Sequence, residues 1–582
     1  MPEASEFGQV RFVSRQGERL YQNPEAIVTA ASPAEVAPAL ECLRTAVQSG
    51  WHAAGYLAYE AAPAFEPRLT THSPSGIPLL WFGLYRAPAW LDPRPAPCRG
   101  AFHVGDWDPL VPEAEYHEAI ARIRAYIAAG DAYQVNYTFP LRAPFEGNPL
   151  DWFRQLTAAQ GGDHGAYVDA GRFQVLSASP ELFFELRDGS AAARPMKGTR
   201  PRGLWPAQDR AMAGALRESQ KDRAENVMIV DLLRNDLGRI AATGTVEAPS
   251  LFDVERYETV WQMTSTVTAK TDGDAADLLG ALFPSGSVTG APKIRAMEII
   301  RELEPYPRGV YCGTIGWWAP GPEARFNVAI RTVTVHPAKQ RAEYHTGGGI
   351  TWDSRSEAEF QECRAKAALL VRKPAAFQLL ESLLFDGAAF WLLDEHLRRL
   401  EESAAYFGVT CRWADLRAEL TDMAERLRGK GPRKVRLLLD REGAWTLEDG
   451  PAPPADPISV GLAPAPIDPD NVFLYHKTTE RSVYEKALAA RPDCGDVFLW
   501  NFKGELTEST RANLVLELDG KLVTPPVVCG LLAGVYRDAL LREGTIVEGV
   551  VHKEDLSRAG RLWLINSVRG WMEALLLDAK PL

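Results

Sequence analysis

A lysine with the features of a reactive amine lies in the stretch Arg194–Arg200, which reads RPMKGTR. Lys197 stands between an apolar residue and a Gly-Thr turn, and the neighbouring segments have the composition of buried strands. Lysine is rarely buried without a partner, so one interpretation is an ordinary cation in a basic loop beside Arg194, Arg200 and Arg202. The alternative is a nucleophile whose pKa is lowered by desolvation and by neighbouring cations. This stretch alone leaves both interpretations open.

Two further segments carry pairs of carboxylates at a spacing of three residues. Asp222 and Glu225 form the first pair, and Glu359 and Glu362 form the second. On a helix this spacing puts both side chains of a pair on one face. If the two helices faced each other, four oxygen donors could hold Mg²⁺, which also keeps several waters. Spacing alone favours ordinary solvated salt-bridge faces, because such pairs are common on helices.

Hydrophobic periodicity predicts the elements that position these residues. Helices are expected over residues 116–130, 222–237, 291–304 and 354–370, and strands over 165–170, 173–179 and 326–335. A seam at 371–378 precedes a new apolar stretch, and residues 383–408 predict a strand pair followed by a helix. The proline-rich join at 450–459 predicts a division of this second region into two lobes.

Length, charge and composition argue against several classes of protein. The chain has 582 residues, too many for one core, and a net charge of -12 that argues against a nucleic-acid binder or a polybasic membrane-surface protein. No segment approaches roughly 18 uninterrupted apolar residues, and the first ten residues lack the features of a signal peptide. The seven cysteines are scattered and form no CxxC pair. We therefore expect a cytoplasmic protein with reduced thiols.

Several motifs of the first region follow one another in a fixed order. They are YIAAGDAYQVN (126–136), SASPELF (177–183), PMKGTRPRG (195–203), DRAENVMIVDLLRNDLGRI (222–240), FPSGSVTGAPKIRAMEII (283–300), RGVYCGTIG (308–316), NVAIRT (327–332) and GGGITWDSRSEAEFQEC (347–363). Together they resemble the chorismate-utilising enzymes, which include anthranilate, aminodeoxychorismate, isochorismate and salicylate synthases. The resemblance covers nearly all of residues 50–370 and implies a large α+β fold around a Mg²⁺-dependent chorismate site.

The resemblance also implies roles for single residues. Glu225 and Glu362 would be the best Mg²⁺ ligands, with Asp222 and Glu359 in or near the same shell, and Glu181 would be the general acid that protonates the departing C4 hydroxyl. Chorismate is a dicarboxylate, so it needs cations and backbone N–H donors, which glycine-rich turns can bring close. The residues expected to bind it are Gln134, Thr289, Tyr311, Arg331, Gly347 and Gly348.

Lys197 separates the branches of this family. Anthranilate synthases are expected to have alanine at its position, whereas aminodeoxychorismate synthases have lysine, so Lys197 resembles the nucleophile that attacks C2 of chorismate. Gln134 argues against the water-adding relatives, which place a lysine base there. One departure is Gln262, which stands where many relatives have a histidine. No glutaminase motif is evident, so ammonia is expected from a separate glutamine amidotransferase or from solution.

The second region carries a looser set of motifs: YHKTTERSVYEKA (475–487), ELTESTRANLVL (505–516), GLLAGVYRDALL (530–541) and LWLINSVRG (562–570). They resemble the fold-type IV pyridoxal-phosphate (PLP) enzymes, which include aminotransferases and aminodeoxychorismate lyase. By this resemblance Lys477 would hold PLP and Glu508 would accept a hydrogen bond from its pyridine nitrogen. The phosphate would contact Arg399, the backbone at Val535 and Tyr536, and the hydroxyl of Ser567.

Alternatives remain for this region. When each motif is considered alone, Lys477 can be interpreted as an exposed lysine at the end of a strand, and the segment around Arg399 as an amphipathic surface helix. Tyr536 stands where aminotransferases usually have threonine, which favours a lyase over a transaminase.

The two regions together predict an α+β protein with two domains. Residues 1–373 would form the chorismate-binding domain, and residues 374–582 a smaller two-lobed PLP domain. The first would make 4-amino-4-deoxychorismate and the second would release pyruvate from it to give 4-aminobenzoate, a folate precursor. The alternatives are an anthranilate-type synthase fused to an aminotransferase, and a chorismate-binding regulatory protein. We expect no nucleic-acid or membrane partner, and a homodimer through the PLP domain is left open.

Overall fold

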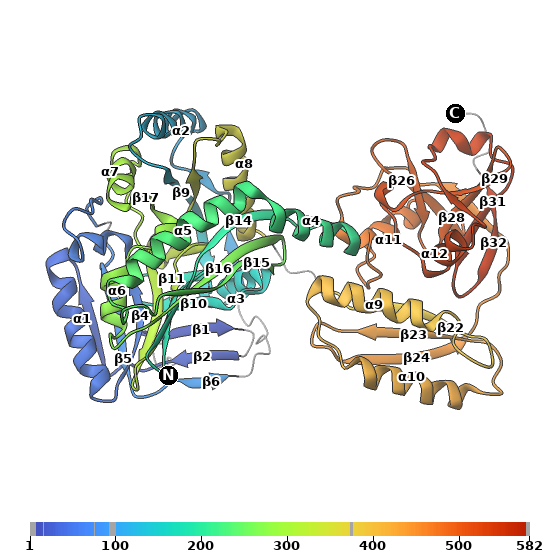
Figure 1. Cartoon of the computed structure of the whole chain (residues 1–582). Helices are drawn as coiled ribbons and strands as arrows, with labels where there is room; N and C mark the ends of the chain where they lie inside the picture. Colours follow the sequence, from blue (N-terminus) through green and yellow to red (C-terminus); the bar gives the residue numbers. More distant parts are fainter. Residues whose placement is uncertain (1–6, 15–16, 75, 92–100, 373–375, 578–582) are drawn as a thin grey trace. The chain divides into compact units, whose positions relative to one another are not determined.

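The computed structural model describes residues 7–14, 17–74, 76–91, 101–372 and 376–577, and the chain divides into two compact units (Figure 1). The first unit contains residues 1–202 and 213–374, and the second contains residues 203–212 and 375–582. The domain boundary expected at residues 373 and 374 lies outside the described residues. Residues 203–212, which include the start of α4 (Pro206–Glu218), belong to the second unit, although the sequence placed them in the first domain.

Two large sheets form the framework of the first unit. The 11-stranded sheet has the order β17-β9-β21-β20-β11-β10-β1-β2-β6, with β7 and β8 also paired to β9. Its strands are β1 (Val10–Ser14), β2 (Gly17–Tyr21), β6 (Ala89–Leu91), β7 (Phe102–Val104), β8 (Asp108–Pro109), β9 (Gln134–Gly147), β10 (His164–Asp169), β11 (Gln174–Ser179), β17 (Gly290–Ala291), β20 (Thr332–His336) and β21 (Arg341–Ile350).

The second sheet has ten strands in the order β14-β16-β13-β12-β19-β18-β4-β5-β3, with β15 also paired to β16. Its strands are β3 (Ala26–Ala30), β4 (His52–Leu57), β5 (Leu80–Tyr85), β12 (Leu182–Arg187), β13 (Ser190–Arg194), β14 (Met196–Pro201), β15 (Glu247–Arg256), β16 (Val260–Lys270), β18 (Thr314–Ala319) and β19 (Glu323–Val328).

The continuous apolar runs of the central strands arise because both faces of the first sheet are buried. In β10, Ala166 and Val168 pack into a core that contains side chains from both sheets. Tyr167, on the opposite face, packs into a second core with residues of the surrounding helices. Successive side chains of a strand point to opposite faces, so burial of both faces leaves no polar alternation.

Helices cover the sheets and carry part of the candidate site. They are α1 (Pro33–Gln48), α2 (Glu113–Ala128), α3 (Pro149–Gln160), α5 (Gln220–Gly238), α6 (Ala275–Leu282), α7 (Lys293–Leu303), α8 (Ser356–Ala367) and the short turns η1 (Tyr59–Ala64), η2 (Gly286–Val288), η3 (Pro337–Lys339) and η4 (Ala368–Leu370). Figure 1 shows α2 and α8 together in this unit, where Tyr116 and Phe360 pack with their ring centroids 5.2 Å apart. This contact fixes α8, the helix expected to provide two metal ligands.

The second unit begins with a lobe of three strands and two helices. The strands are β22 (Leu379–Phe385), β23 (Arg433–Leu439) and β24 (Trp445–Pro451), and the helices are α9 (Leu393–Phe407) and α10 (Trp413–Leu427). The strand pair expected after residue 383 is reduced to one isolated bridge between Phe385 and Phe390. The reason is that the chain turns at Asp386, whose carboxylate accepts two backbone N–H groups, and then enters α9. The partner of β22 is instead β23.

After the proline-rich join the chain forms an eight-stranded sheet. Its strands are β25 (Ile458–Leu462), β26 (Asp496–Trp500), β27 (Leu506–Ser509), β28 (Asn513–Leu518), β29 (Lys521–Thr524), β30 (Val547–Glu548), β31 (Leu562–Asn566) and β32 (Gly570–Leu576), accompanied by α11 (Ser482–Ala489), α12 (Val535–Arg542) and the turns η5 (Val472–Leu474), η6 (Val527–Cys529) and η7 (Lys553–Ser557). Because β27 pairs with β26 and with β28, the sheet closes into a barrel. The closing pair is Glu508 and Asn513. The predicted α+β architecture and the two-lobed second region are confirmed.

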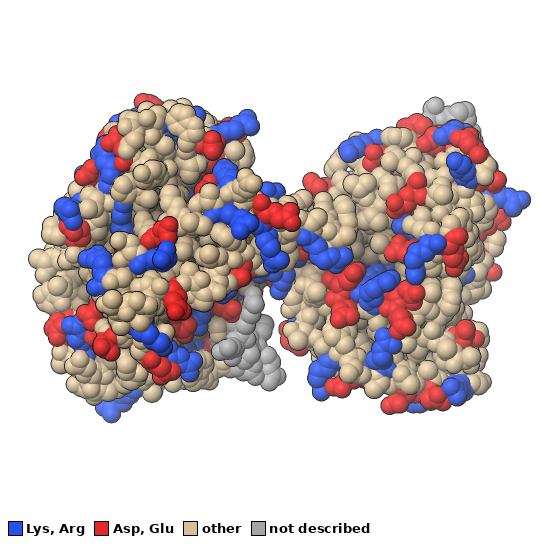
Figure 2. Space-filling view, viewed as in Figure 1, with Lys and Arg blue, Asp and Glu red and all other residues tan. Residues whose placement is uncertain are grey.

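The surface carries mixed charge. On the face drawn in Figure 2, Lys and Arg side chains are interspersed with Asp and Glu over both units. Within the described ranges, no helix has the length and apolar character needed to cross a membrane. Of the cysteines in those ranges, Cys42, Cys312, Cys363, Cys411 and Cys529 are free thiols, and Cys98 lies outside the ranges.

Candidate active sites

A cavity of about 760 Å³ in the first unit brings most of the predicted residues together. It is lined by strands of both sheets and by α5 and α8. The predicted residues that line it are Glu181, Lys197, Asp222, Glu225, Tyr311, Arg331, Gly347, Gly348, Glu359 and Glu362. Gln134 and Thr289 are not in its lining, although both lie next to it in the fold.

Lys197 reaches into this cavity from β14. Its Nζ lies 3.2 Å from Oε2 of Glu225, and its side chain is 17% exposed. A Cβ placed on Gly349 would lie 2.8 Å from Nζ of Lys197 and 2.6 Å from Nε2 of Gln134. A side chain at 349 would therefore displace both groups, which explains why glycine is needed there. The charged group that contacts Lys197 is thus the Glu225 carboxylate. The guanidinium of Arg194, three residues earlier in the chain, pairs with Glu255.

The two predicted carboxylate pairs face the same cavity from α5 and α8. Glu225 also contacts Nζ of Lys221 at 3.9 Å, and Glu362 contacts Nζ of Lys366 at 2.8 Å. Burial raises the pKa of Glu359, and the neighbouring Glu362 carboxylate adds to this effect. Lys366, more than any other group, lowers the pKa of Glu362. Carboxylate oxygens are donors that Mg²⁺ prefers, but no three of these four side chains have ligand atoms within 4.8 Å of one another.

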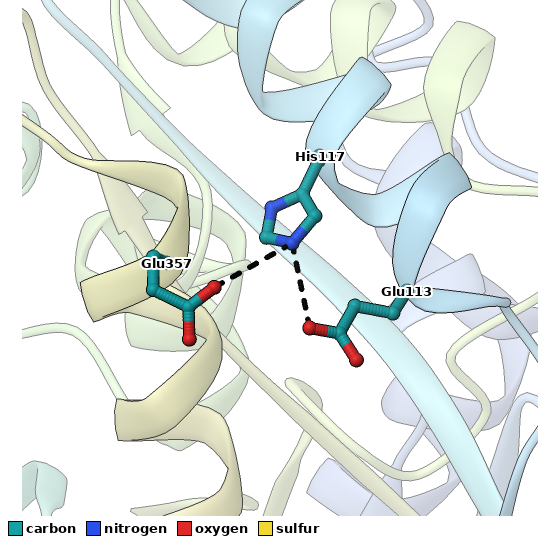
Figure 3. Close-up of side chains that lie close together, drawn as sticks. All are labelled: Glu113, His117 and Glu357. Atoms are coloured by element: carbon teal, nitrogen blue, oxygen red, sulfur yellow. Dashed lines mark ion pairs between the residues drawn. The ribbon is translucent and has the colours of Figure 1, made fainter.

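A tighter group of His117 with two carboxylates lies elsewhere, between α2 and α8 (Figure 3). Nε2 of His117 is 3.5 Å from Glu113 and 3.8 Å from Glu357. In the described part of the chain, this is the one group of three such side chains whose ligand atoms all lie within 4.8 Å. Both carboxylates are more than half exposed and none of the three lines the cavity. We interpret it as a surface ion-pair cluster.

Glu181 is placed as a buried acid at the cavity wall. Oγ of Ser287 donates a hydrogen bond of 2.7 Å to its carboxylate. Burial raises the pKa of Glu181 to about 7, against the smaller effects of the Ser287 hydrogen bond and of Lys197. A carboxyl group with this pKa is substantially protonated at neutral pH and can donate a proton.

Arg331 interrupts what the sequence predicts as one strand over 326–335. The chain forms β19 and β20 with a break between them, and Arg331 in the break has a left-handed φ of 51°. Its guanidinium is buried and donates to Oε1 of Gln160. Among the described residues no carboxylate pairs with it. A buried cation without an anion, held in an uncommon backbone conformation, fits a group that awaits an anionic ligand.

The remaining residues predicted to bind substrate differ in the contacts that their side chains already make within the protein. The amide nitrogen and oxygen of Gln134 are buried and have no hydrogen-bond partner among the described residues. The Thr289 hydroxyl donates to the Ser285 carbonyl at 3.0 Å, so it is already engaged. The ring of Tyr311 stacks on His345 with centroids 5.3 Å apart.

In the second unit Lys477 is an enclosed amine close to charged groups. Burial, followed by the charge of Arg399, lowers the pKa of Lys477 to about 8. Its carbonyl accepts a hydrogen bond from the Leu380 N–H at 2.9 Å. The first lobe therefore anchors the chain at this lysine.

Glu508 sits where the barrel closes and is held by three donors. The Tyr484 hydroxyl donates at 2.8 Å, the Asn513 amide at 3.2 Å and the Leu532 N–H at 3.2 Å. Burial raises the pKa of Glu508 to about 7. A buried acid and a buried amine in one site, with a guanidinium nearby, fit a phosphorylated pyridine cofactor such as PLP.

Arg399 has a partner that the sequence analysis missed. Its guanidinium donates to both oxygens of Glu381, at 2.8 and 2.6 Å, and to the Ala533 carbonyl at 3.2 Å. Although burial opposes it, Arg399 and then His396 hold the pKa of Glu381 well below its usual range. This pairing directs Arg399 toward the loop that precedes α12.

The other predicted phosphate contacts lie at the ends of elements. Val535 begins α12, and the Tyr536 ring packs on Trp391 with centroids 4.9 Å apart. Ser567 directly follows β31 and is 8% exposed.

The sequence analysis also missed Ser287, Gln160 and Tyr484 as partners of Glu181, Arg331 and Glu508. Ser287 lies inside a quoted motif, which is a signal that could have found it. Tyr484 lies inside the motif at 475–487 and carries the same signal. Gln160 comes from a helix distant in sequence from Arg331, and no local pattern marks it.

Comparison with known proteins agrees with this geometry. Residues 8–372 match the chorismate binding enzyme family, and the chain belongs to this family. Residues 378–576 match amino-transferase class IV, so the second unit is a class IV domain.

Individual relatives match parts of the first unit. Aminodeoxychorismate synthase component 1 of Klebsiella aerogenes is 44% identical over 277 residues, which are 47% of this chain and 61% of that protein. Anthranilate synthase component 1 of Streptomyces coelicolor is 37% identical over 366 residues, covering 54% of this chain and 71% of that protein. The chain thus spans about three fifths of the length of the first of these relatives.

A solved structure has the same arrangement of elements. Anthranilate synthase component I from Streptococcus pneumoniae superposes with a TM-score of 0.53 at 27% identity, covering 62% of this chain and 90% of that one. The relatives thus include both amine-forming branches of the family, and the residues of the site must distinguish them.

Proposed function

We propose that the first unit converts chorismate and ammonia into 4-amino-4-deoxychorismate, and that the second converts this intermediate into 4-aminobenzoate and pyruvate. The observation that carries the proposal is the position of Lys197, a side-chain amine in the wall of a cavity that also contains an acid and an uncompensated guanidinium. Relatives called aminodeoxychorismate synthase component 1 support the first of these two reactions.

In this mechanism chorismate lies with a carboxylate on the Arg331 guanidinium. Lys197 Nζ attacks C2 as a neutral amine, so it must first lose a proton and leave its ion pair with Glu225. Both ring double bonds shift by one position as the C4 hydroxyl leaves as water, using the proton of Glu181. Ammonia then bonds to C4 and the Lys197 amine leaves C2, which restores both ring double bonds and puts an amino group where the hydroxyl was.

Mg²⁺ would be held by Glu225 and Glu362, with Asp222 and Glu359 beside them. When bound, it supplies positive charge that balances an anionic substrate. The carboxylates that take this role must release Lys197, Lys221 and Lys366, which contact two of them in the structure.

In the second unit Lys477 would hold the cofactor and move protons, because a lysine of lowered pKa can act as a general base near neutrality. Glu508 would hold the proton of the pyridine nitrogen, and Arg399 with the start of α12 would bind the phosphate. PLP supplies an electron sink when bound. Tyr484 and Asn513 keep the Glu508 carboxylate in place.

Ammonia would come from a partner glutamine amidotransferase, since the relatives are called component 1. The direct test is to incubate the full chain with chorismate, Mg²⁺, PLP and ammonium, and to identify the aromatic amine by chromatography. We expect 4-aminobenzoate. Formation of anthranilate instead would favour the alternative branch of the family.

A further inference from the structure

Lys197 lies on a bulge in its strand. β14 and β16 pair at Met196 with Thr264 and again at Thr199 with Gln262, and the register shifts between the two pairs. Two residues, Lys197 and Gly198, therefore stand opposite the single residue Met263. A bulge takes backbone groups out of the ladder and re-aims a side chain.

Two side chains hold the carbonyls of this bulge. Nε2 of Gln262 donates to the Gly198 carbonyl at 2.8 Å, and its Oε1 accepts from Oγ1 of Thr199, also at 2.8 Å. Nδ2 of Asn226 donates to the Lys197 carbonyl at 3.3 Å. A buried carbonyl left without a donor is costly, so these amides stabilise the bulged conformation.

The backbone conformation and the close neighbours at position 198 require glycine. Gly198 has a φ of 101°, and a Cβ there would lie 3.0 Å from Cβ of Asp222 and 3.3 Å from Cβ of Met263. The backbone is thus enclosed between α5 and β16. Gln262, which is 8% exposed, is the side chain that spans both Gly198 and Thr199.

We propose that Gln262 is a positioning residue that fixes the bulge, and so directs the Lys197 amine into the cavity beside Glu225 and Gly349. An amide donates and accepts at every pH, whereas an imidazole at this position would change its roles near neutrality. The effect of Gln262 on catalysis rests on the proposed function, in which Lys197 is the nucleophile. The effect of Gln262 on the orientation of Lys197 is independent of that function.

Gln262→Met tests the proposal because it keeps a side chain of similar length and removes both hydrogen bonds. We expect kcat for aminodeoxychorismate formation to fall by at least about tenfold, since small displacements of a reacting group have large effects on rate. KM for chorismate should stay within about twofold, because Arg331 does not depend on the bulge. Gln155→Met is the matched control. Gln155 does not line the cavity, its amide donates to the Arg372 carbonyl at 3.2 Å, and its change should leave kcat unaltered.

A second readout does not depend on activity. Acetic anhydride labels lysine amines, and peptide mass spectrometry gives the labelling of Lys197 relative to the exposed Lys270. This ratio should change by at least about threefold in Gln262→Met and remain unchanged in Gln155→Met. Thr199→Val, which breaks only one of the two hydrogen bonds, should shift it in the same direction by a smaller factor.

The outcomes separate the two proposals. A changed labelling ratio in a chain that makes no aminodeoxychorismate would support the positioning role and contradict the proposed function. An unchanged ratio in Gln262→Met overturns the positioning role, whether or not kcat falls. In the Lys197→Ala background, Gln262→Met should have no further effect on rate, and a full additional loss would also overturn it.

Discussion

Lys197 in the first unit and Lys477 in the second unit meet opposite electrostatic surroundings. Lys197 is partly exposed in a large cavity, and the nearest charge is the Glu225 carboxylate at 3.2 Å. Lys477 is enclosed, and burial together with Arg399 lowers its pKa to about 8. The fold therefore makes the Lys477 amine easier to deprotonate, whereas Lys197 is paired with a carboxylate.

This difference teaches that a shared residue type does not imply a shared mode of activation. An amine that holds a resident cofactor benefits from a permanently low pKa. An amine that attacks a transient substrate can stay paired until substrate and cation arrive. Variants of the two lysines, and then of the groups around each, test this difference.

Lys197→Ala should have the largest effect. We expect aminodeoxychorismate formation to fall by at least about 10³-fold, because no other amine takes the place of the nucleophile. Conversion of supplied intermediate to 4-aminobenzoate should persist, since Lys477 lies in the other unit. Both rates are measured by chromatography, and a variant with the full synthase rate would remove Lys197 from the mechanism.

Lys477→Ala should produce the reverse pattern, with the intermediate accumulating and no 4-aminobenzoate formed. The variant should also lack the visible absorbance of lysine-bound PLP. Glu508→Ala should have a smaller effect than Lys477→Ala. It should keep the cofactor, but its rate should fall by about tenfold or more, since the pyridine nitrogen loses its hydrogen-bond acceptor. If Lys477→Ala keeps the absorbance band, another lysine holds the cofactor.

The synthase rate should fall as the pH rises through about 7. Burial raises the pKa of Glu181 to about 7, so the protonated acid is present below this pH and is lost above it. Glu181→Gln should lower the rate by about 10²-fold or more and abolish this limb of the profile. A wild-type kcat that stays constant from pH 6 to pH 9 would argue against Glu181 as the acid.

Glu225→Gln and Glu362→Gln should each raise the Mg²⁺ concentration for half-maximal rate by about tenfold or more, because a neutral amide is a poorer ligand for a hard cation. Glu357→Gln is the control on α8, since Glu357 belongs to the exposed cluster with His117. Its Mg²⁺ titration should match the wild type. An unchanged titration for Glu225→Gln would identify Glu225 only as the partner of Lys197.

The sequence predicted the elements that carry chemistry better than the contacts that tune it. Long periodic segments such as the helix of Asp222 and Glu225 were predicted because their signal is local. The left-handed break at Arg331 was not, since residues 326–335 read as one continuous strand.

The contacts that hold the bulge at Lys197 and the guanidinium of Arg399 join different elements of the fold. Gln262 contacts Gly198 across a bulge in a sheet, and Glu381 contacts Arg399 from a strand to a helix. Neither contact leaves a local pattern. The assignment of residues 203–212 to the second unit is of the same kind.

The most direct test of the whole account follows one sample through both reactions. The full chain, freed of PLP, is given chorismate, Mg²⁺ and ammonium, and the products are measured before and after PLP is added. We predict that 4-amino-4-deoxychorismate accumulates first, and that PLP then converts it into equal amounts of 4-aminobenzoate and pyruvate. Anthranilate as the product, or an intermediate that PLP leaves unchanged, would contradict the assignment of consecutive reactions to the two units.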